Sequence, residues 1–146
     1  MKAYKVVQRL KNGDKVSCLM PKETGLRATY MTHGEIKTVP EGMVFQDLIL
    51  ANNFAGGDWD EVWECEVDGM VPIFRVVTWY NLSIYDTLKK YKSLLYDNVF
   101  INKSGLKNVA LDNNMGDILT VRLSNAPAGT FLATNIKLVK MIERTV

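Results

Sequence analysis

Alternating apolar and polar residues dominate the first third of the chain and predict strands. Two such runs, Ala3–Leu10 and Lys15–Met20, are joined through Asn12-Gly13. An Asn-Gly pair accepts the positive φ values that a tight hairpin turn requires, so the chain is expected to begin with a hairpin. Three further strands are expected in this third, over Leu26–Met31, Ile36–Val39 and Met43–Phe45.

Two later segments change to the 3.6-residue period of a helix. Over residues 47–55 the apolar side chains recur at steps of three and four, and Gly56-Gly57 follows as a natural stop. Over residues 83–96 isoleucine, leucine and tyrosine share one stripe, and Ser83 followed by Asp86 approximates a capping box. Strand-like runs resume after that segment and continue towards the end of the chain.

Hairpins and helices that are segregated along the chain predict the α+β class. We expect one domain over residues 1–146, built on a mainly antiparallel, twisted sheet with two helices, about 47–55 and 83–96. A chain of this length can bury roughly two-thirds of its unfolded surface, which is enough to fold without metal or disulfide help. Apolar residues make up 47% of the chain, and this argues against extended disorder.

The cysteines and the N-terminus indicate the compartment. Cys18 and Cys65 are far apart in apolar, alternating surroundings, and we expect two buried free thiols in a reducing environment. The N-terminus has no apolar stretch of the signal-peptide kind, and no run approaches the ~20 apolar residues of a membrane span. These features predict a soluble intracellular protein that contacts no membrane.

Charge is distributed very unevenly. The formal net charge is only +2, yet the eight carboxylates between residues 37 and 75 meet no lysine or arginine there, while both flanking segments are basic. Six of these carboxylates fall within residues 58–68, where Trp63, Cys65 and Val67 occupy every second position. Period two predicts a strand with one apolar face and one largely acidic face. The second face carries Val62, Glu64, Glu66 and Asp68.

The acidic face allows three interpretations. Cations on neighbouring strands, such as Lys5 and Arg9 or Lys137 and Lys140, would neutralise it within the fold. If it is exposed, it would dock onto a basic surface of another protein. Paired carboxylates in a cleft would instead serve acid–base chemistry or bind Mg²⁺. For docking, we take the contact set to be Asp58, Trp59, Asp60, Glu64, Glu66 and Asp68.

The sequence carries no recognisable catalytic or cofactor-binding set. His33 is the single histidine, and its Thr-His-Gly-Glu setting is typical of a turn. The cysteines lack the paired spacing of a zinc site, and Gly56-Gly57 is not followed by the Lys-Ser or Lys-Thr of a phosphate loop. We therefore expect no catalytic residues, no metal and no cofactor.

Lysines in and after the segment 83–96 offer a different kind of contact. They would bind phosphates, with tyrosines such as Tyr85 stacking on bases, although lysines on a solvated helix face are also ordinary. In this alternative the nucleic-acid contacts are Lys89, Lys90, Lys92, Lys103 and Lys107.

Five segments occur in a suggestive order along the chain: Tyr4–Val7, Tyr30–Gly34, Met43–Phe54, Val62–Val67 and Gly129–Ala133. This order resembles small uncharacterised proteins encoded by bacteriophages and related mobile elements. A fainter similarity is to ADP-ribosyltransferase-like folds, in which strands bracket a short helix before an acidic strand. No Arg, Ser/Thr and Glu combination of that family can be placed in this sequence.

The phage-like pattern and the acidic run together lead to one hypothesis. It is a non-enzymatic phage-type accessory protein in the cytoplasm of the host cell, which binds a host protein through the acidic strand face and antagonises a defence or nucleic-acid-processing system. A nucleotide-binding or nucleotide-modifying protein is the first alternative, with Glu64 or Glu66 as the polar anchor. Nucleic-acid binding through the lysines is the second. The oligomeric state stays open, a homodimer included.

Overall fold

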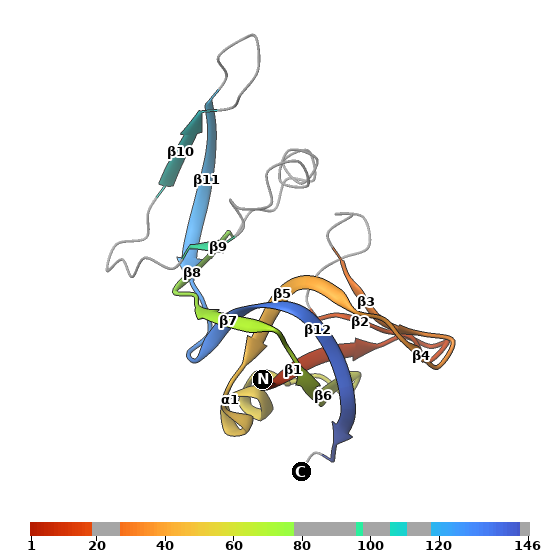
Figure 1. Cartoon of the computed structure of the whole chain (residues 1–146). Coiled ribbons are helices and arrows are strands. Elements are labelled where there is room, and N and C mark those ends of the chain that lie inside the picture. The colour runs from red at the N-terminus through yellow and green to blue at the C-terminus, as the bar shows by residue number, and fades with distance from the viewer. Residues whose placement is uncertain (19–26, 78–95, 98–105, 111–117, 144–146) are drawn as a thin grey trace. The chain divides into compact units, whose positions relative to one another are not determined.

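The chain folds into two compact units (Figure 1). The computed structural model describes residues 1–18, 27–77, 96–97, 106–110 and 118–143. The first unit consists of Met1–Pro72 and Pro127–Val146, and the second consists of Ile73–Ala126. The second unit is therefore inserted into the first as one continuous piece of chain, at a point where the sequence shows no linker.

All strand pairings in the described part of the chain are antiparallel. The first unit is an eight-stranded sheet in the order β4-β3-β2-β1-β5-β12-β6 with β7 beside β12, and the second unit is a four-stranded sheet in the order β10-β11-β8-β9. The elements of the first unit are β1 (Lys2–Arg9), β2 (Lys15–Ser17), β3 (Thr29–Thr32), β4 (Glu35–Ile36), β5 (Val39–Phe45), α1 (Leu48–Phe54), β6 (Asp60–Glu66), β7 (Gly69–Pro72) and β12 (Thr130–Ile142). Those of the second are β8 (Arg75–Val77), β9 (Tyr96–Asp97), β10 (Leu106–Ala110) and β11 (Ile118–Asn125).

Four strands of the first unit close into a ring. β1 pairs with β5 on one edge and with β6 on the other, and β12 pairs with the same two strands. β12 is 13 residues long, so its first half lies beside β5 and its second half beside β6. A bulge between Leu138 and Lys140 bends it, and Figure 1 shows the curvature of β12 over the other strands.

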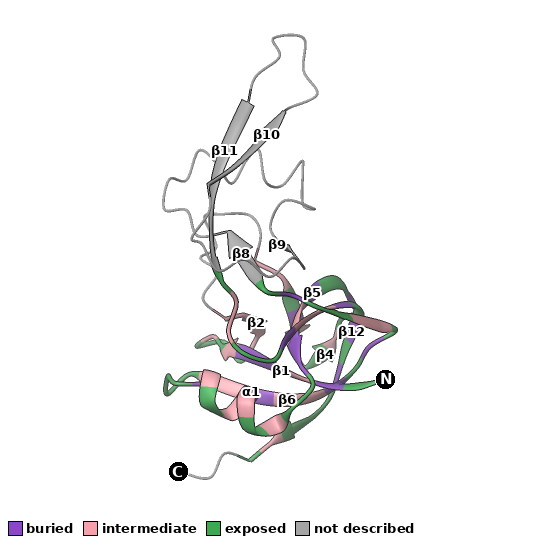
Figure 2. Cartoon of the chain, turned by 90° about the vertical axis from the view of Figure 1, so that its left-hand side faces the viewer, coloured by how far each residue is buried: buried purple, intermediate pink, exposed green. Residues whose placement is uncertain are grey.

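Two hydrophobic clusters hold the first unit together, one on each face of β1. Ala3 and Val7 belong to one cluster and Val6 to the other, because successive strand residues face opposite sides. Figure 2 shows the buried segments gathered along the ring strands. The first cluster fills the ring with Tyr30, Val39, Val44, Cys65, Val67, Ala133, Ile136 and Leu138. The second places α1 against the outer face through Phe45, Ala51, Ala55 and Val62.

Helix α1 confirms the helix predicted over residues 47–55. Asp47 caps it, because its carboxylate accepts a hydrogen bond from the backbone amide of Ile49 at 2.7 Å. Phe54 at its end lies against Phe45 of β5, with ring centroids 5.4 Å apart. Among the described residues no helix is long and apolar enough to cross a membrane.

The expected α+β class is wrong. The described residues form twelve strands and one helix of seven residues, so the chain is mostly antiparallel β-sheet. The predicted hairpins are present as β1–β2 and β3–β4, but the pairing of distant strands into a closed ring is not encoded in local periodicity. Of the second predicted helix, residues 83–95 lie outside the described residues and Tyr96 lies on β9.

Candidate functional site

The strand predicted to carry the acidic face is β6, and its two faces differ in burial most clearly at Cys65 and Glu66. Cys65 is fully buried and Trp63 is partly buried, while Glu64 and Glu66 alternate with them and remain at least partly exposed. Val62 departs from the pattern because it is fully buried on the acidic side. It packs in the cluster under α1, which covers that end of the face.

On the β1 side, Glu64 and Glu66 are paired within the fold. Lys2 Nζ lies 3.1 Å from Glu64 Oε1, and the N-terminal ammonium of Met1 donates to Glu66. The hydrogen bond to Glu64, followed by one to Tyr4, raises the pKa of the Lys2 ammonium above its ordinary value. Each glutamate of this face therefore has a cationic partner.

On the β12 side, two more lysines stand beside the same glutamates. Lys140 is opposite Glu64 and Lys137 is opposite Glu66 in the strand register. Opposite charges across neighbouring strands contribute about 0.2–1 kcal/mol each. Among the described residues, this face of β6 thus carries three lysines, counting Lys2, for two glutamates. The ion pairs of these two glutamates are made by Lys2 and the N-terminal ammonium, while Lys137 and Lys140 stand opposite them in the strand register.

Two other residues of the predicted contact set hold turns. The Asp60 carboxylate accepts a hydrogen bond from the Gly57 amide at 2.9 Å, which closes the turn that leads into β6. The Asp68 carboxylate accepts one from Asn135 Nδ2 at 2.6 Å and links the end of β6 to β12. Asp58 is exposed in the turn that Asp60 closes. Asp60 and Asp68 therefore have local structural roles, and Asp58 lies in the turn before β6, apart from Glu64 and Glu66.

The sixth residue, Trp59, is 48% exposed and begins a line of contacts on the other face of β6. The Arg9 guanidinium lies 5.0 Å from the Trp59 ring centroid, and its Nη1 lies 3.8 Å from Glu61 Oε2. Trp63 Nε1 donates to Glu61 Oε1 at 3.0 Å. Met141 stands opposite Trp63 on β12 and is 54% exposed. We call these five residues the Trp59 surface.

Glu61 fixes the geometry of the Trp59 surface. Lys15 Nζ lies 2.9 Å from one of its carboxylate oxygens and 3.1 Å from the other, and both side chains are 12% exposed. With Trp63 and Arg9, the carboxylate has three donor side chains around it. The hydrogen bonds from Lys15 and Trp63 are charge-assisted and stronger than neutral ones, so the carboxylate is satisfied and holds Trp63 in place, while Arg9 lies beside it as an ion pair.

Sequence reasoning missed Arg9, Glu61 and Met141 as parts of one surface. One signal was available, because Glu61 has the same parity as Trp63 along β6 and therefore shares its face. Arg9 and Met141 come from strands that are distant in the sequence, and only the pairings of β1 and β12 with β6 bring them there.

The lysines of the nucleic-acid alternative are mostly not described by the structure. Lys89, Lys90, Lys92 and Lys103 lie outside the described residues, and Lys107 lies on β10. No geometry therefore connects them.

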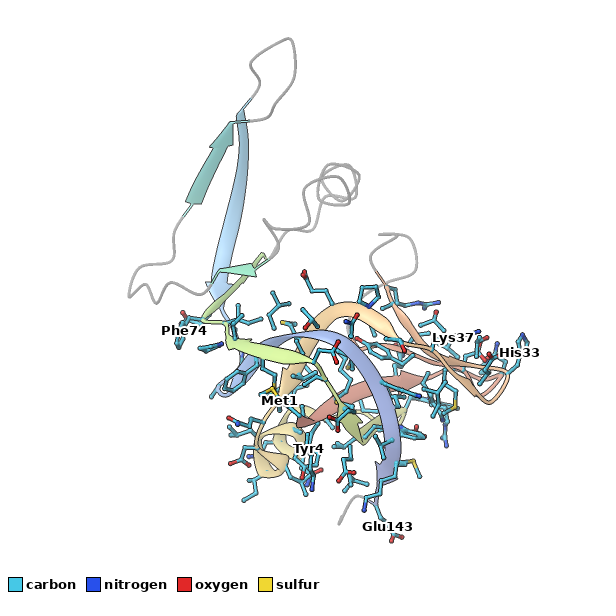
Figure 3. All side chains as sticks on the ribbon, viewed as in Figure 1. Met1, Tyr4, His33, Lys37, Phe74 and Glu143 are labelled. Carbon is cyan, nitrogen blue, oxygen red and sulfur yellow. The ribbon has the colours of Figure 1, made fainter. Side chains whose placement is uncertain are left out.

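The structure agrees with the predicted turn at His33 and with the predicted burial of one of the two cysteines. His33 is exposed, has a φ of +51°, and lies at the tip of the β3–β4 hairpin (Figure 3), which confirms the predicted turn. Both cysteines are thiols, as expected; Cys65 is buried, whereas Cys18 is only partly buried and its Sγ lies 3.5 Å from Asp60 Oδ1. Burial raises the pKa of the Cys65 thiol to about 12. Within the described residues no group of three or more His, Cys, Asp or Glu side chains is placed to hold a metal ion.

Comparison with known proteins finds no family model, no curated protein and no solved structure that matches this chain. The resemblance to phage-encoded proteins and the fainter one to ADP-ribosyltransferase-like folds stay predictions. Only the geometry of the chain itself bears on its function.

Proposed function

We propose that this chain is a non-enzymatic binding protein and that the Trp59 surface docks a protein of the host cell. The observation that carries the proposal is the exposure of Trp59 and Met141, each about half exposed, at the two ends of one continuous line of contacts. Tryptophan, arginine and methionine are enriched where protein interfaces are buried. An aromatic side chain that is already held in place loses little conformational entropy on binding.

The charges of the surface indicate the chemistry of the partner. Arg9 and Lys15 bring two positive charges to the one carboxylate of Glu61, and the Arg9 side chain is 45% exposed. A partner with an apolar group for Trp59 and a carboxylate within reach of Arg9 matches both features. The partner we propose is therefore acidic around its contact, not basic.

The neutralised face of β6 is not part of this proposal. Docking through Glu64 and Glu66 needs an excess of negative charge, whereas Lys2 and the N-terminal ammonium pair with these two glutamates and two lysines of β12 stand opposite them. Long-range attraction of a basic partner depends on the summed charge of a face, not on its carboxylates alone.

A capture experiment with matched variants tests the proposal. Tagged wild-type protein is compared with a Trp59→Ala, Met141→Ser double variant and with Ile49→Ser as the control, since Ile49 is 69% exposed on α1 and outside the surface. We expect a host protein that the wild type and the control retain to be lost from the double variant. Truncation of an interface tryptophan costs about 2 kcal/mol or more, roughly thirtyfold in affinity.

A charge-reversal arm separates this surface from the acidic face. Glu64→Lys combined with Glu66→Lys should leave the retained protein bound. If this variant loses the protein while the Trp59 and Met141 double variant keeps it, the contact lies on the acidic face and the proposal fails.

A further inference from the structure

The turn between β1 and β2 contains the one asparagine of the sequence that is followed by a glycine, Asn12-Gly13. Both residues are exposed, and Gly13 has a φ of +92°. A Cβ atom built on Gly13 would meet no heavy atom of the described residues within 4 Å, apart from its immediate neighbours in the chain. The backbone of Gly13 is therefore open on the side where other residues carry a side chain.

Two hydrogen bonds hold Asn12 and Gly13 in this turn. The Gly13 amide donates to the Leu10 carbonyl at 2.9 Å, and the Asn12 Oδ1 atom accepts from the Asp14 amide at 3.0 Å. Local opening of a hairpin tip breaks such bonds without unfolding the core, and it costs far less than global unfolding. One opening event therefore releases the Gly13 nitrogen and the Asn12 side chain together.

The geometry of the turn is the simplest explanation of this residue pair. Glycine adopts the positive φ at no steric cost, and the asparagine side chain binds the amide two residues further on. This structural role leaves the chemistry of the pair unchanged, because a cyclic imide can form between a side-chain amide and the next backbone nitrogen wherever that nitrogen is unhindered. Asn53 and Asn135 are also exposed, but phenylalanine and isoleucine follow them and hinder the same attack.

We propose that Asn12 is a site of spontaneous deamidation in the folded protein. Hydroxide removes the proton of the Gly13 amide, and the nitrogen then attacks the Asn12 Cγ atom. A bond forms between that nitrogen and Cγ, the bond between Cγ and Nδ2 breaks, and Nδ2 leaves as ammonia with a proton from water. Water then opens the cyclic imide at either carbonyl: cleavage at Cγ gives aspartate, and cleavage at the Asn12 backbone carbonyl carbon gives isoaspartate. The net change is the hydrolysis of one amide, with water as the co-reactant.

Either product changes the link between the β1–β2 and β3–β4 hairpins. The Asn12 Nδ2 atom donates to Asp14 Oδ2 at 3.3 Å. The same Asp14 carboxylate accepts hydrogen bonds from Thr32 Oγ1 and from the His33 amide, each at 3.1 Å. A carboxylate at position 12 replaces the amide donor by a like charge beside Asp14, and isoaspartate also adds a methylene group to the backbone of the turn. We therefore expect the modified protein to be less stable than the fresh protein.

Peptide mapping of the full chain by mass spectrometry tests the proposal. The folded protein is incubated in mildly alkaline buffer, and a second sample is incubated unfolded in urea. In the folded protein we expect the peptide with Asn12 to gain the mass difference between NH₂ and OH before the peptides with Asn53 and Asn135, at a rate that rises with pH. Faster conversion at Asn53 or Asn135, or no conversion of Asn12 while the unfolded chain converts, would overturn the proposal. The measurement needs no binding partner, and the turn shares no residue with the Trp59 surface, so the inference does not depend on the docking proposal.

Two comparisons complete the design. The two turn hydrogen bonds must break before the imide forms, so at typical strengths they should slow conversion of Asn12 roughly 5- to 150-fold in the folded protein relative to the chain in urea. Equal rates in the two states would refute this control by the turn. Asn12→Ser keeps a polar turn residue without an amide, so its peptide should gain no mass and its urea midpoint should not change on incubation. The wild-type midpoint should fall as conversion proceeds, and a midpoint that stays constant in fully converted protein would refute the effect on the hairpins.

Discussion

Replacing Gly42 by alanine tests the packing inside the ring. Gly42 is buried on β5, and a Cβ atom built there would lie 2.8 Å from Tyr30 Oη and 3.0 Å from Ile136 Cδ1. Neither neighbour has free space to withdraw, because Tyr30 is 1% exposed and Ile136 is fully buried. The added methyl group must therefore displace a strand or a ring.

Two opposing contributions set the size of the expected effect. Overpacking a well-packed core costs about 1–3 kcal/mol, while alanine in place of glycine stabilises by about 0.4–1 kcal/mol through the unfolded chain, so the net loss is about 0–2.6 kcal/mol, near 1.3 kcal/mol at the middle of both ranges. No strain enters, since Gly42 does not have a positive φ. We expect urea unfolding to show a lower midpoint for Gly42→Ala with an unchanged m-value.

A second background identifies the cause. Tyr30→Phe removes the Oη atom nearest to the new methyl group, so Gly42→Ala should cost less there, with a coupling of about 0.5 kcal/mol or more. Gly34→Ala is the control for backbone strain alone, because Gly34 has a φ of +74° and open space around it. An equal effect of Gly42→Ala in both backgrounds would refute the placement of Tyr30 over β5.

Three further predictions concern pH, thiol chemistry and the inserted unit. The Asp14 carboxylate accepts a hydrogen bond from the backbone amide of His33 in the β3–β4 turn, and this bond is the largest cause that lowers the pKa of Asp14. The stability that the ionised Asp14 contributes is present at neutral pH and is lost as the pH falls through that lowered pKa. Urea midpoints measured across acidic pH should therefore fall less steeply for Asp14→Asn, and an unchanged slope would contradict this. The Cys65 thiol, with its pKa raised to about 12, should hold about a thousandfold less thiolate than an ordinary thiol, so rapid labelling of Cys65 in the folded protein would contradict its burial. The Ala126 amide donates to the Phe74 carbonyl at 2.9 Å, so the two ends of the insertion meet. Replacing residues 75–125 by a short Gly-Asn turn should therefore leave a first unit that unfolds cooperatively when followed by circular dichroism. A product that unfolds without cooperativity would show that the first unit needs the second.

Local patterns predicted the elements of the first unit well. The alternation of Cys65 and Val67 with Glu66 and Asp68 matches their burial, the helical period over residues 47–55 matches α1, and the Asn12-Gly13 pair lies in the β1–β2 turn, with Gly13 at a φ of +92°. Each of these depends on neighbours in the sequence, for which backbone sterics and side-chain periodicity suffice.

Contacts between distant strands decide the fold class and the surroundings of the acidic residues, and local sequence patterns do not reveal these contacts. Val62 looked like a surface position of the acidic face, but α1 buries it. Local patterns left open whether Glu64 is exposed or paired, and the strand register decides it, because Lys2 on β1 pairs with Glu64 and Lys140 on β12 stands opposite it. The closure of the ring decides both the fold class and the charge of this face, and it depends on the register of strands more than 50 residues apart in the chain.

The affinity for a captured partner tests most directly whether function resides on the Trp59 surface. Calorimetry would compare the wild type with Trp59→Ala and with the Glu64→Gln, Glu66→Gln double variant at one salt concentration. We predict a loss of roughly thirtyfold or more for Trp59→Ala and an affinity close to wild type for the glutamine variant. Unchanged binding by Trp59→Ala together with a large loss in the glutamine variant would contradict the account.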